Sequence, residues 1–252
     1  PECNPLTLSK YANIGNWHND FLTNIDENFI PNNSPTITYT QKINAISAFN
    51  QDYATQLGLN LADQKDLQAE IENFKELVDR YVAYDRFFES TDILDNLDLY
   101  GLMAELKSLD IIDEFELNLI NNLLDLVKAN HAGSLSINQL NEALQGLQAE
   151  WIAQGYTECG AHGEFSAMVL SISLASVEWW LSNPGAGNIV LRVAPWVAAD
   201  VGGAIYGAGA GALGSYLING EVSWKATAWA SLAGAVGAST GIAGKIGKWL
   251  FG

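Results

Sequence analysis

The sequence predicts an all-α protein in two unlike parts, and three observations lead to this expectation. Apolar residues recur three and four positions apart through most of residues 8–151, which is the spacing of amphipathic helices. Residues 1–159 hold 25 acidic and 8 basic side chains, whereas residues 160–252 hold 4 of each and six of the eight tryptophans. We therefore expect an acidic amphipathic helical bundle at residues 1–158 and a charge-balanced, Gly/Ala/Trp-rich glycine-zipper module at residues 159–252.

The first half of the acidic part predicts three helices. Apolar stripes run through residues 8–29, 43–57 and 67–88, each with polar residues on the opposite face. Two prolines within residues 31–35 separate the first two stripes, because proline lacks an amide donor and restricts the residue before it. A loop is therefore expected there.

The second half of the acidic part predicts three more helices. One covers residues 94–106, with Asp98 on its solvated face. The next covers residues 115–126 and ends near Gly133, which can adopt the left-handed conformation that follows many helices. A capping box at residues 136–139 opens the last stripe, which ends at a tryptophan.

The charge-poor part predicts an apolar helix followed by a helical hairpin. Residues 165–181 are apolar apart from serines and one glutamate, and they stop before a proline. Uncharged arms at residues 201–218 and 226–244 flank a turn at residues 219–220. At a rise of 1.5 Å per residue the arms reach about 27–28 Å, close to the hydrocarbon thickness of a bilayer.

Small residues at four-residue intervals give each arm a smooth face. In a soluble helix each glycine costs about 0.5–1 kcal/mol relative to alanine, whereas in lipid such stripes let helices approach closely. Tryptophans and lysines near the arm ends suit the headgroup region and anionic lipid. The predicted packing glycines are Gly203, Gly207, Gly211, Gly214, Gly234, Gly237 and Gly241, and the predicted interface anchors are Trp196, Trp224, Trp229, Lys245, Lys248 and Trp249.

Two stretches resemble known groups of proteins. Roughly the last 55 residues, with repeated Gly-xxx-Gly and the ending Lys248-Trp249-Leu250-Phe251, resemble glycine-zipper, bacteriocin-like peptides, which are small exported pore-formers. The stretch Asn4-Pro5 … Ile14-Gly15-Asn16-Trp17-His18-Asn19 … Leu22 is similar to the start of uncharacterised exported or surface proteins of Gram-negative bacteria, which often end in a Gly/Ala-rich tail. The resemblance implies export to the cell envelope or the medium, and it implies no particular activity.

Two residue pairs are candidates for structural links. Cys3 and Cys159 are either joined by a disulfide, which needs an oxidising compartment, or are two free thiols. Glu178 lies in an apolar helix, where a carboxylate needs a partner, and Arg192 follows the next turn. We therefore expect a Glu178–Arg192 ion pair.

The sequence favours no catalytic, metal or cofactor site. The net charge of −17 argues against nucleic acid, because phosphate binding needs clustered cations. Cys159 and His162 lack the further ligands of a zinc site, and a thiol nucleophile cannot be recognised from their spacing. His18 is more typical of a capped or core-edge histidine than of a ligand.

The expected function is therefore non-enzymatic. The glycine-zipper helices would mediate membrane interaction or self-association, and the acidic bundle would shield them until a lipid bilayer or another copy competes for their faces. The alternative is a soluble structural or partner-binding protein in which the glycine stripes serve core packing only.

Overall fold

The computed structural model describes residues 3–29, 94, 97–183 and 193–239, and these residues are mostly α-helical, which confirms the all-α class. The described part contains no strand and only an isolated bridge between Pro5 and Thr157. The stripes predicted at residues 43–57 and 67–88 lie outside the described residues. The helices are the 3-10 helix η1 (Leu8–Lys10) and the α-helices α1 (Ala12–Phe29), α6 (Leu99–Ser108), α7 (Glu114–His131), α8 (Ile137–Gln154), α9 (Glu164–Ser182), α10 (Val193–Asn219) and α11 (Trp224–Ser239).

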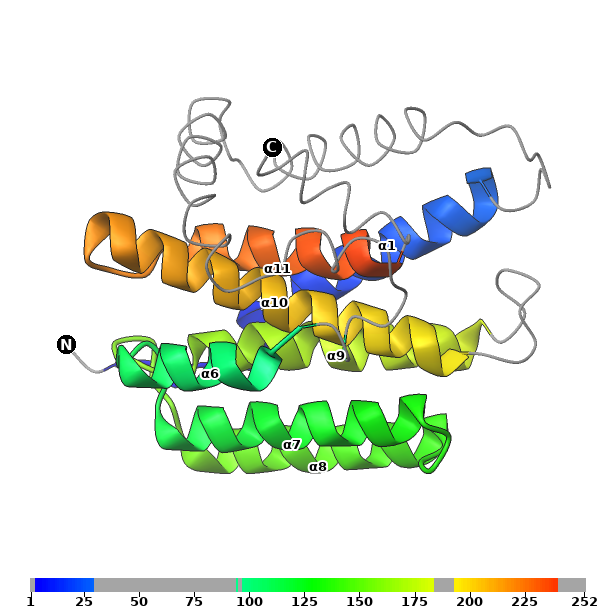
Figure 1. The fold of residues 1–252 in the computed structure, drawn as a ribbon, viewed down its shortest axis with the longest axis horizontal. Helices are drawn as coiled ribbons and strands as arrows, with labels where there is room; N and C mark the ends of the chain where they lie inside the picture. Colours follow the sequence, from blue (N-terminus) through cyan, green and yellow to red (C-terminus); the bar gives the residue numbers. More distant parts are fainter. Residues whose placement is uncertain (1–2, 30–93, 95–96, 184–192, 240–252) are drawn as a thin grey trace.

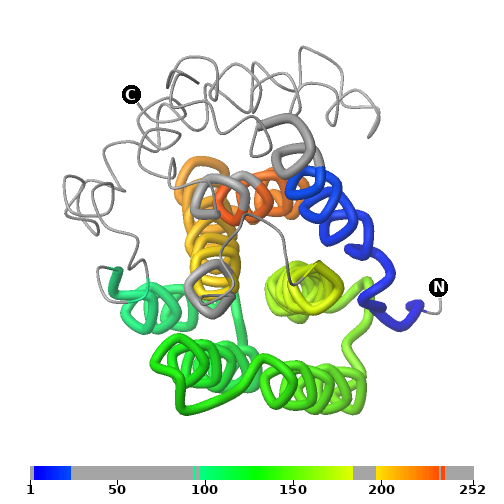
Figure 2. The backbone as a smooth tube through the Cα atoms, turned by 90° about the vertical axis from the view of Figure 1, so that its right-hand side faces the viewer, coloured from blue at the N-terminus to red at the C-terminus, as the bar shows by residue number. Residues whose placement is uncertain are grey.

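The described helices form three layers (Figure 1). Viewed along the helices, α7 and α8 form one outer layer, α9 and α10 the middle layer, and α11 and α1 the other outer layer, with α6 beside α7 and α10 (Figure 2). One hydrophobic cluster runs through all three layers, so residues on both sides of the compositional boundary at 158/159 share a core. Two helices of the charge-poor part, α9 and α10, occupy its centre, and the third, α11, lies in an outer layer.

The middle position of α9 and α10 follows from their composition. Every residue of α9 from Glu164 to Ser173 is buried, in agreement with its nearly continuous apolar sequence. The outer helices α7 and α8 instead bury one face each, at positions three and four apart. Helices that are apolar all round need cover on every side, and amphipathic helices supply it.

The helix ends follow local sequence signals. The capping box at Ser136 and Gln139 is present: the Ser136 amide donates to Gln139 Oε1 at 2.9 Å, and the Ser136 hydroxyl accepts from the Gln139 amide at 3.3 Å. Gly133 has the expected left-handed conformation, with φ of 77°. Asp98 is exposed, as expected of a solvated residue, and it also caps α6 by accepting a hydrogen bond from the Gly101 amide at 2.8 Å.

Candidate functional site: the glycine-lined pair and its buried anchor

The two predicted glycine stripes face each other between α10 and α11, which we call the glycine-lined pair. A β-carbon at Gly207 would overlap the carbonyl group of Ala230, lying 2.7 Å from its carbon. A β-carbon at Gly234 would in turn overlap the carbonyl group of Gly203, lying 3.0 Å from its carbon. The two backbones are therefore in direct contact, with no side chain between them at these points.

The contact continues to the end of the hairpin. At Gly211 a β-carbon would lie 2.9 Å from the Cα of Thr227. Near the turn, the Ser215 hydroxyl accepts a hydrogen bond from the Ser223 amide at 3.0 Å. Gly220 has φ of 75° in this turn, a conformation that glycine adopts without strain. The hairpin is thus closed by backbone contact along its length and by one serine at its tip.

Some of the remaining predicted packing and anchor residues lie within the described part of the chain, and others lie outside it. Gly214 is buried in α10, and Gly237 lies in α11. Trp224 and Trp229 are half-buried, and Trp224 packs against the core. Gly241, Lys245, Lys248, Trp249 and the side chain of Trp196 lie outside the described residues. The headgroup role of all these anchors stays a prediction.

Two glycines outside the predicted stripes hold the covering helices close. A β-carbon at Gly209 of α10 would lie 2.6 Å from Cδ2 of Leu102 on α6. A β-carbon at Gly15 of α1 would lie 2.8 Å from the carbonyl oxygen of Ser171 on α9. The close packing therefore extends from the pair itself to helices that cover it.

A buried polar cluster fixes α10 to α9 and α1, and we call it the anchor. Asp200 of α10 is completely buried. Its Oδ2 accepts hydrogen bonds from the Ser176 hydroxyl at 2.6 Å and from the Trp180 indole at 3.1 Å. His18 Nε2 lies 3.4 Å from the same oxygen. Three helices thus meet at one carboxylate.

The anchor is an ion pair in a dry environment. His18 is completely buried, deeper than the predicted core edge. Burial is the largest single effect and lowers the pKa of His18, but the charge of Asp200 and the polar contacts with Asp200 and Asn19 together outweigh it, so the pKa is raised. The other ring nitrogen, Nδ1, lies 3.1 Å from Asn19 Oδ1. Asp200 Oδ1 is buried and has no hydrogen-bond partner among the described residues, so this carboxylate depends on His18 for its charge balance.

The anchor contains serine, histidine and aspartate, but its geometry does not suit nucleophilic catalysis. The Ser176 hydroxyl donates to Asp200, whereas a nucleophilic serine must donate to the histidine that removes its proton. The side chains of Ser176, His18 and Asp200 are also buried within the core. This arrangement can hold helices together and cannot present a nucleophile to a substrate.

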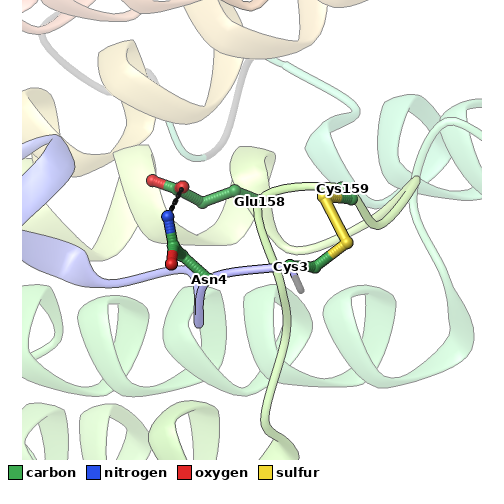
Figure 3. The surroundings of a disulfide bond; sticks show 4 residues. All are labelled: Cys3, Asn4, Glu158 and Cys159. Atoms are coloured by element: carbon green, nitrogen blue, oxygen red, sulfur yellow. Dashed lines mark hydrogen bonds between the residues drawn. A yellow bond between two sulfur atoms is a disulfide. The ribbon is translucent and has the colours of Figure 1, made fainter. Parts of the chain in front are cut away.

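A second link ties the N-terminus to the start of α9. Cys3 and Cys159 form a disulfide, with their Cα atoms 5.6 Å apart (Figure 3). Beside it, the Asn4 side-chain amide donates to Glu158 Oε2 at 3.3 Å, and the Glu158 amide donates to the Asn4 carbonyl at 2.9 Å. The disulfide, which the sequence left undecided, removes Cys159 from the roles of thiol nucleophile and zinc ligand.

The same end of α1 is also held by charge. Lys10 Nζ lies 2.5 Å from Glu164 Oε1, and the Tyr11 hydroxyl donates to the other oxygen of the same carboxylate. Burial and the neighbouring carboxylate raise the pKa of Tyr11, so its hydroxyl stays protonated and keeps donating. Helix α1 is therefore fixed near its start by Cys3 and Glu164 and further along by Asp200.

The reason for expecting a Glu178–Arg192 pair was that Glu178 would be buried in an apolar helix, and the structure removes this reason. Glu178 is exposed on the surface of α9, so its carboxylate is solvated by water and needs no buried partner. Arg192 lies outside the described residues, and the pair itself stays a prediction. Within the described ranges, no group of three or more His, Cys, Asp and Glu side chains is placed to hold a metal ion.

Two described helices are long and apolar enough to cross a membrane by length and composition. They are Glu164–Ser182, which is α9, and Val197–Asn219 within α10, and most of each is buried inside the protein. From its sequence, the second of these was predicted as a spanning arm, over residues 201–218, and the first only as an apolar helix. A buried core helix passes the same test of composition, so this finding by itself does not assign a membrane.

No protein-family model, curated protein or solved structure matches this chain.

Proposed function

We propose that this protein is a non-enzymatic helical protein that sequesters its glycine-lined pair and releases it to a membrane or to another copy. The observation that carries the proposal is the cover over α10. This apolar helix is packed by α11, α9, α7 and α6, and on one side of the core the amphipathic helices α7 and α8 separate it from water. A face buried in this way is available to lipid only after the cover moves.

The anchor helps to keep the glycine-lined pair inside the folded protein. An ionised carboxylate in a membrane helix is unfavourable, by about 2.5–3.5 kcal/mol at the helix centre and by less near the ends, where Asp200 lies in Val197–Asn219. Within the fold, Asp200 has two hydrogen-bond donors and a histidine at 3.4 Å. The carboxylate therefore favours the closed form, and loss of the His18 contact shifts the balance towards release.

The disulfide supports a location outside the reducing cytosol. Disulfides persist in oxidising environments such as the periplasm, the cell surface and the medium. The bond between Cys3 and Cys159 closes a long loop and fixes the start of α1, which packs on α9 and α11. We therefore place the protein in the cell envelope or outside the cell, where this link keeps the cover in position.

A second function is favoured by the contacts of the glycines themselves. Gly203, Gly207 and Gly234 already contact a helix backbone within one chain. If these contacts are permanent, the stripes serve core packing, and the protein is a soluble structural or partner-binding module. This alternative needs no cover that moves.

Vesicle binding by the full chain separates the two functions. We would measure co-flotation and calcein release with phosphatidylcholine vesicles, with and without phosphatidylglycerol, for the oxidised protein and for Cys3→Ser/Cys159→Ser. The oxidised protein is expected to bind weakly and the double variant to bind and leak vesicles more strongly, because one of the links that hold α1 over α9 and α11 is lost.

A matched control addresses simple loss of stability. Leu144→Ala removes a completely buried side chain from α8 and costs about 2–5 kcal/mol, without touching the links on α1. It should not raise vesicle binding as the double variant does. If no form of the protein binds vesicles, the soluble partner-binding function takes the place of the membrane function.

A further inference from the structure

The tip of the glycine-lined hairpin exposes two large apolar side chains next to each other. Leu217 and Ile218 are 44% and 41% exposed, at the end of α10. Among the described residues only Ile152, on α8, is a further exposed large hydrophobic residue. The rest of α10 from Val197 to Leu213 is almost entirely buried, so the exposure is confined to the tip.

The residues around the tip add aromatic and neutral character. Tyr216 and Trp224 are half-buried on either side of the turn, each with an apolar ring against the core. Side chains with an apolar body and one polar group are enriched where protein meets the membrane interface. Glu221 and Lys225 are both exposed, so the tip carries one charge of each sign.

We propose that this tip, formed by Leu217, Ile218 and Trp224, is the site at which the protein first contacts a phospholipid bilayer. The inference rests on the proposed function and names where contact with the membrane begins. Two exposed aliphatic side chains could be covered by several kinds of partner. A bilayer is favoured because the tip lies at the end of Val197–Asn219, the apolar helix that is long enough to span one.

The charge of the chain determines which bilayer is contacted. With a net charge of −17, the protein as a whole is repelled by anionic lipid. The tip has no net charge from Glu221 and Lys225, so its contact depends on apolar burial and not on attraction to headgroups. Binding to zwitterionic phosphatidylcholine should therefore be nearly independent of salt.

The tip and the anchor lie at opposite parts of α10. From Asp200 to Leu217 the helix rises about 25 Å at 1.5 Å per residue. Contact at the tip thus needs no change at the anchor, and release of the anchor removes nothing from the tip. The two steps, docking and release, are separable by mutation.

The test compares Leu217→Ser/Ile218→Ser with Ile152→Ser in the full chain, using co-flotation with phosphatidylcholine vesicles. Each variant is also made in the Cys3→Ser/Cys159→Ser background. The tip variant should lose at least about tenfold in vesicle partition, because its two side chains no longer transfer apolar surface from water into the bilayer. Ile152→Ser removes the most exposed apolar residue from α8, at 62% exposure, and should leave partition unchanged.

The outcomes distinguish this inference from the proposed function. If the parent protein binds vesicles and the tip variant binds equally well, the tip inference is wrong and the proposed function stands. If neither the oxidised nor the disulfide-free parent binds, both are wrong. If the tip variant abolishes dimer formation in sedimentation and leaves vesicle binding intact, the tip is a contact between copies, which also overturns the inference.

Discussion

The outer pair α7–α8 and the glycine-lined pair α10–α11 are both helical hairpins, and they are held together in different ways. In the outer pair, buried leucines such as Leu123 and Leu144 fill the core, and each helix begins with a capping box. In the glycine-lined pair the backbones touch at Gly207 and Gly234. Where side chains pack together, neighbouring side chains can adjust when one residue is substituted. Where two backbones are in contact, no side chain lies between them that could adjust. The two pairs should therefore respond differently to the same change.

The largest effect is expected where polar contacts fix the glycine-lined pair from outside. Asp200→Ala should lower the free energy of unfolding by about 3–5 kcal/mol, because it leaves His18 buried without its charge partner and removes the acceptor for Ser176. Urea unfolding followed by circular dichroism measures the change. A loss below about 1 kcal/mol would mean that backbone contact alone holds the pair.

A smaller effect of the same anchor should appear in its pH dependence. The pKa of His18 is raised above its usual value of 6.5 in the folded protein, so the histidine contributes stability that is fully present below about pH 6.5. This contribution is lost as the pH rises through the raised folded pKa. The difference in unfolding free energy between the wild type and His18→Gln should therefore shrink towards alkaline pH.

The outer pair contains a buried carboxyl group, that of Glu116, whose pKa is raised like that of His18 but for a different reason. Glu116 accepts hydrogen bonds from the amide and the hydroxyl of Ser166, yet burial raises its pKa above 4.5. Its favourable contribution is present below about pH 4.5 and is lost as the pH rises through the raised value. Glu116→Gln should remove this transition and leave the one that depends on His18. If His18→Gln changes the free energy of unfolding equally at every pH, the ion pair between His18 and Asp200 does not form in solution.

The comparison also shows which features the sequence could predict. Apolar spacing located the described helices, and the capping box at Ser136 and the glycine at position 133 were recognised, because these signals lie within a few residues of one another. The facing stripes of α10 and α11 were suggested by a repeat every four residues. All of these features depend on local sequence.

The anchor could not be predicted, because its members come from three separate segments. Asp200 gave one signal, a single acid in the apolar run Val-Ala-Ala-Asp-Val-Gly-Gly, and an intramembrane or core carboxylate of this kind needs a partner. The same argument was applied to Glu178, which is exposed, while Ser176 two residues earlier points into the core. Which polar residue of an apolar helix faces inwards depends on packing that no single segment contains.

The contrast between the two pairs is tested most directly by adding one methyl group to each. Gly207→Ala should destabilise the protein by about 1–3 kcal/mol, because the new β-carbon overlaps the carbonyl group of Ala230 and neither backbone can move without separating the helices. Thermal or urea unfolding of the full chain measures it. A neutral result would show that the two helices are further apart in solution than in the structure.

The smallest effect has the opposite sign and belongs to the outer pair. Gly146 lies within α8, and a β-carbon there would meet nothing within 4 Å. Gly146→Ala should therefore stabilise the protein by about 0.5–1 kcal/mol, since alanine loses less backbone entropy than glycine when the helix forms. If Gly146→Ala and Gly207→Ala both stabilise, helix propensity outweighs contact in both pairs. Opposite signs would mean that glycine is required at position 207 because of the helix it faces, and that at position 146 it is not.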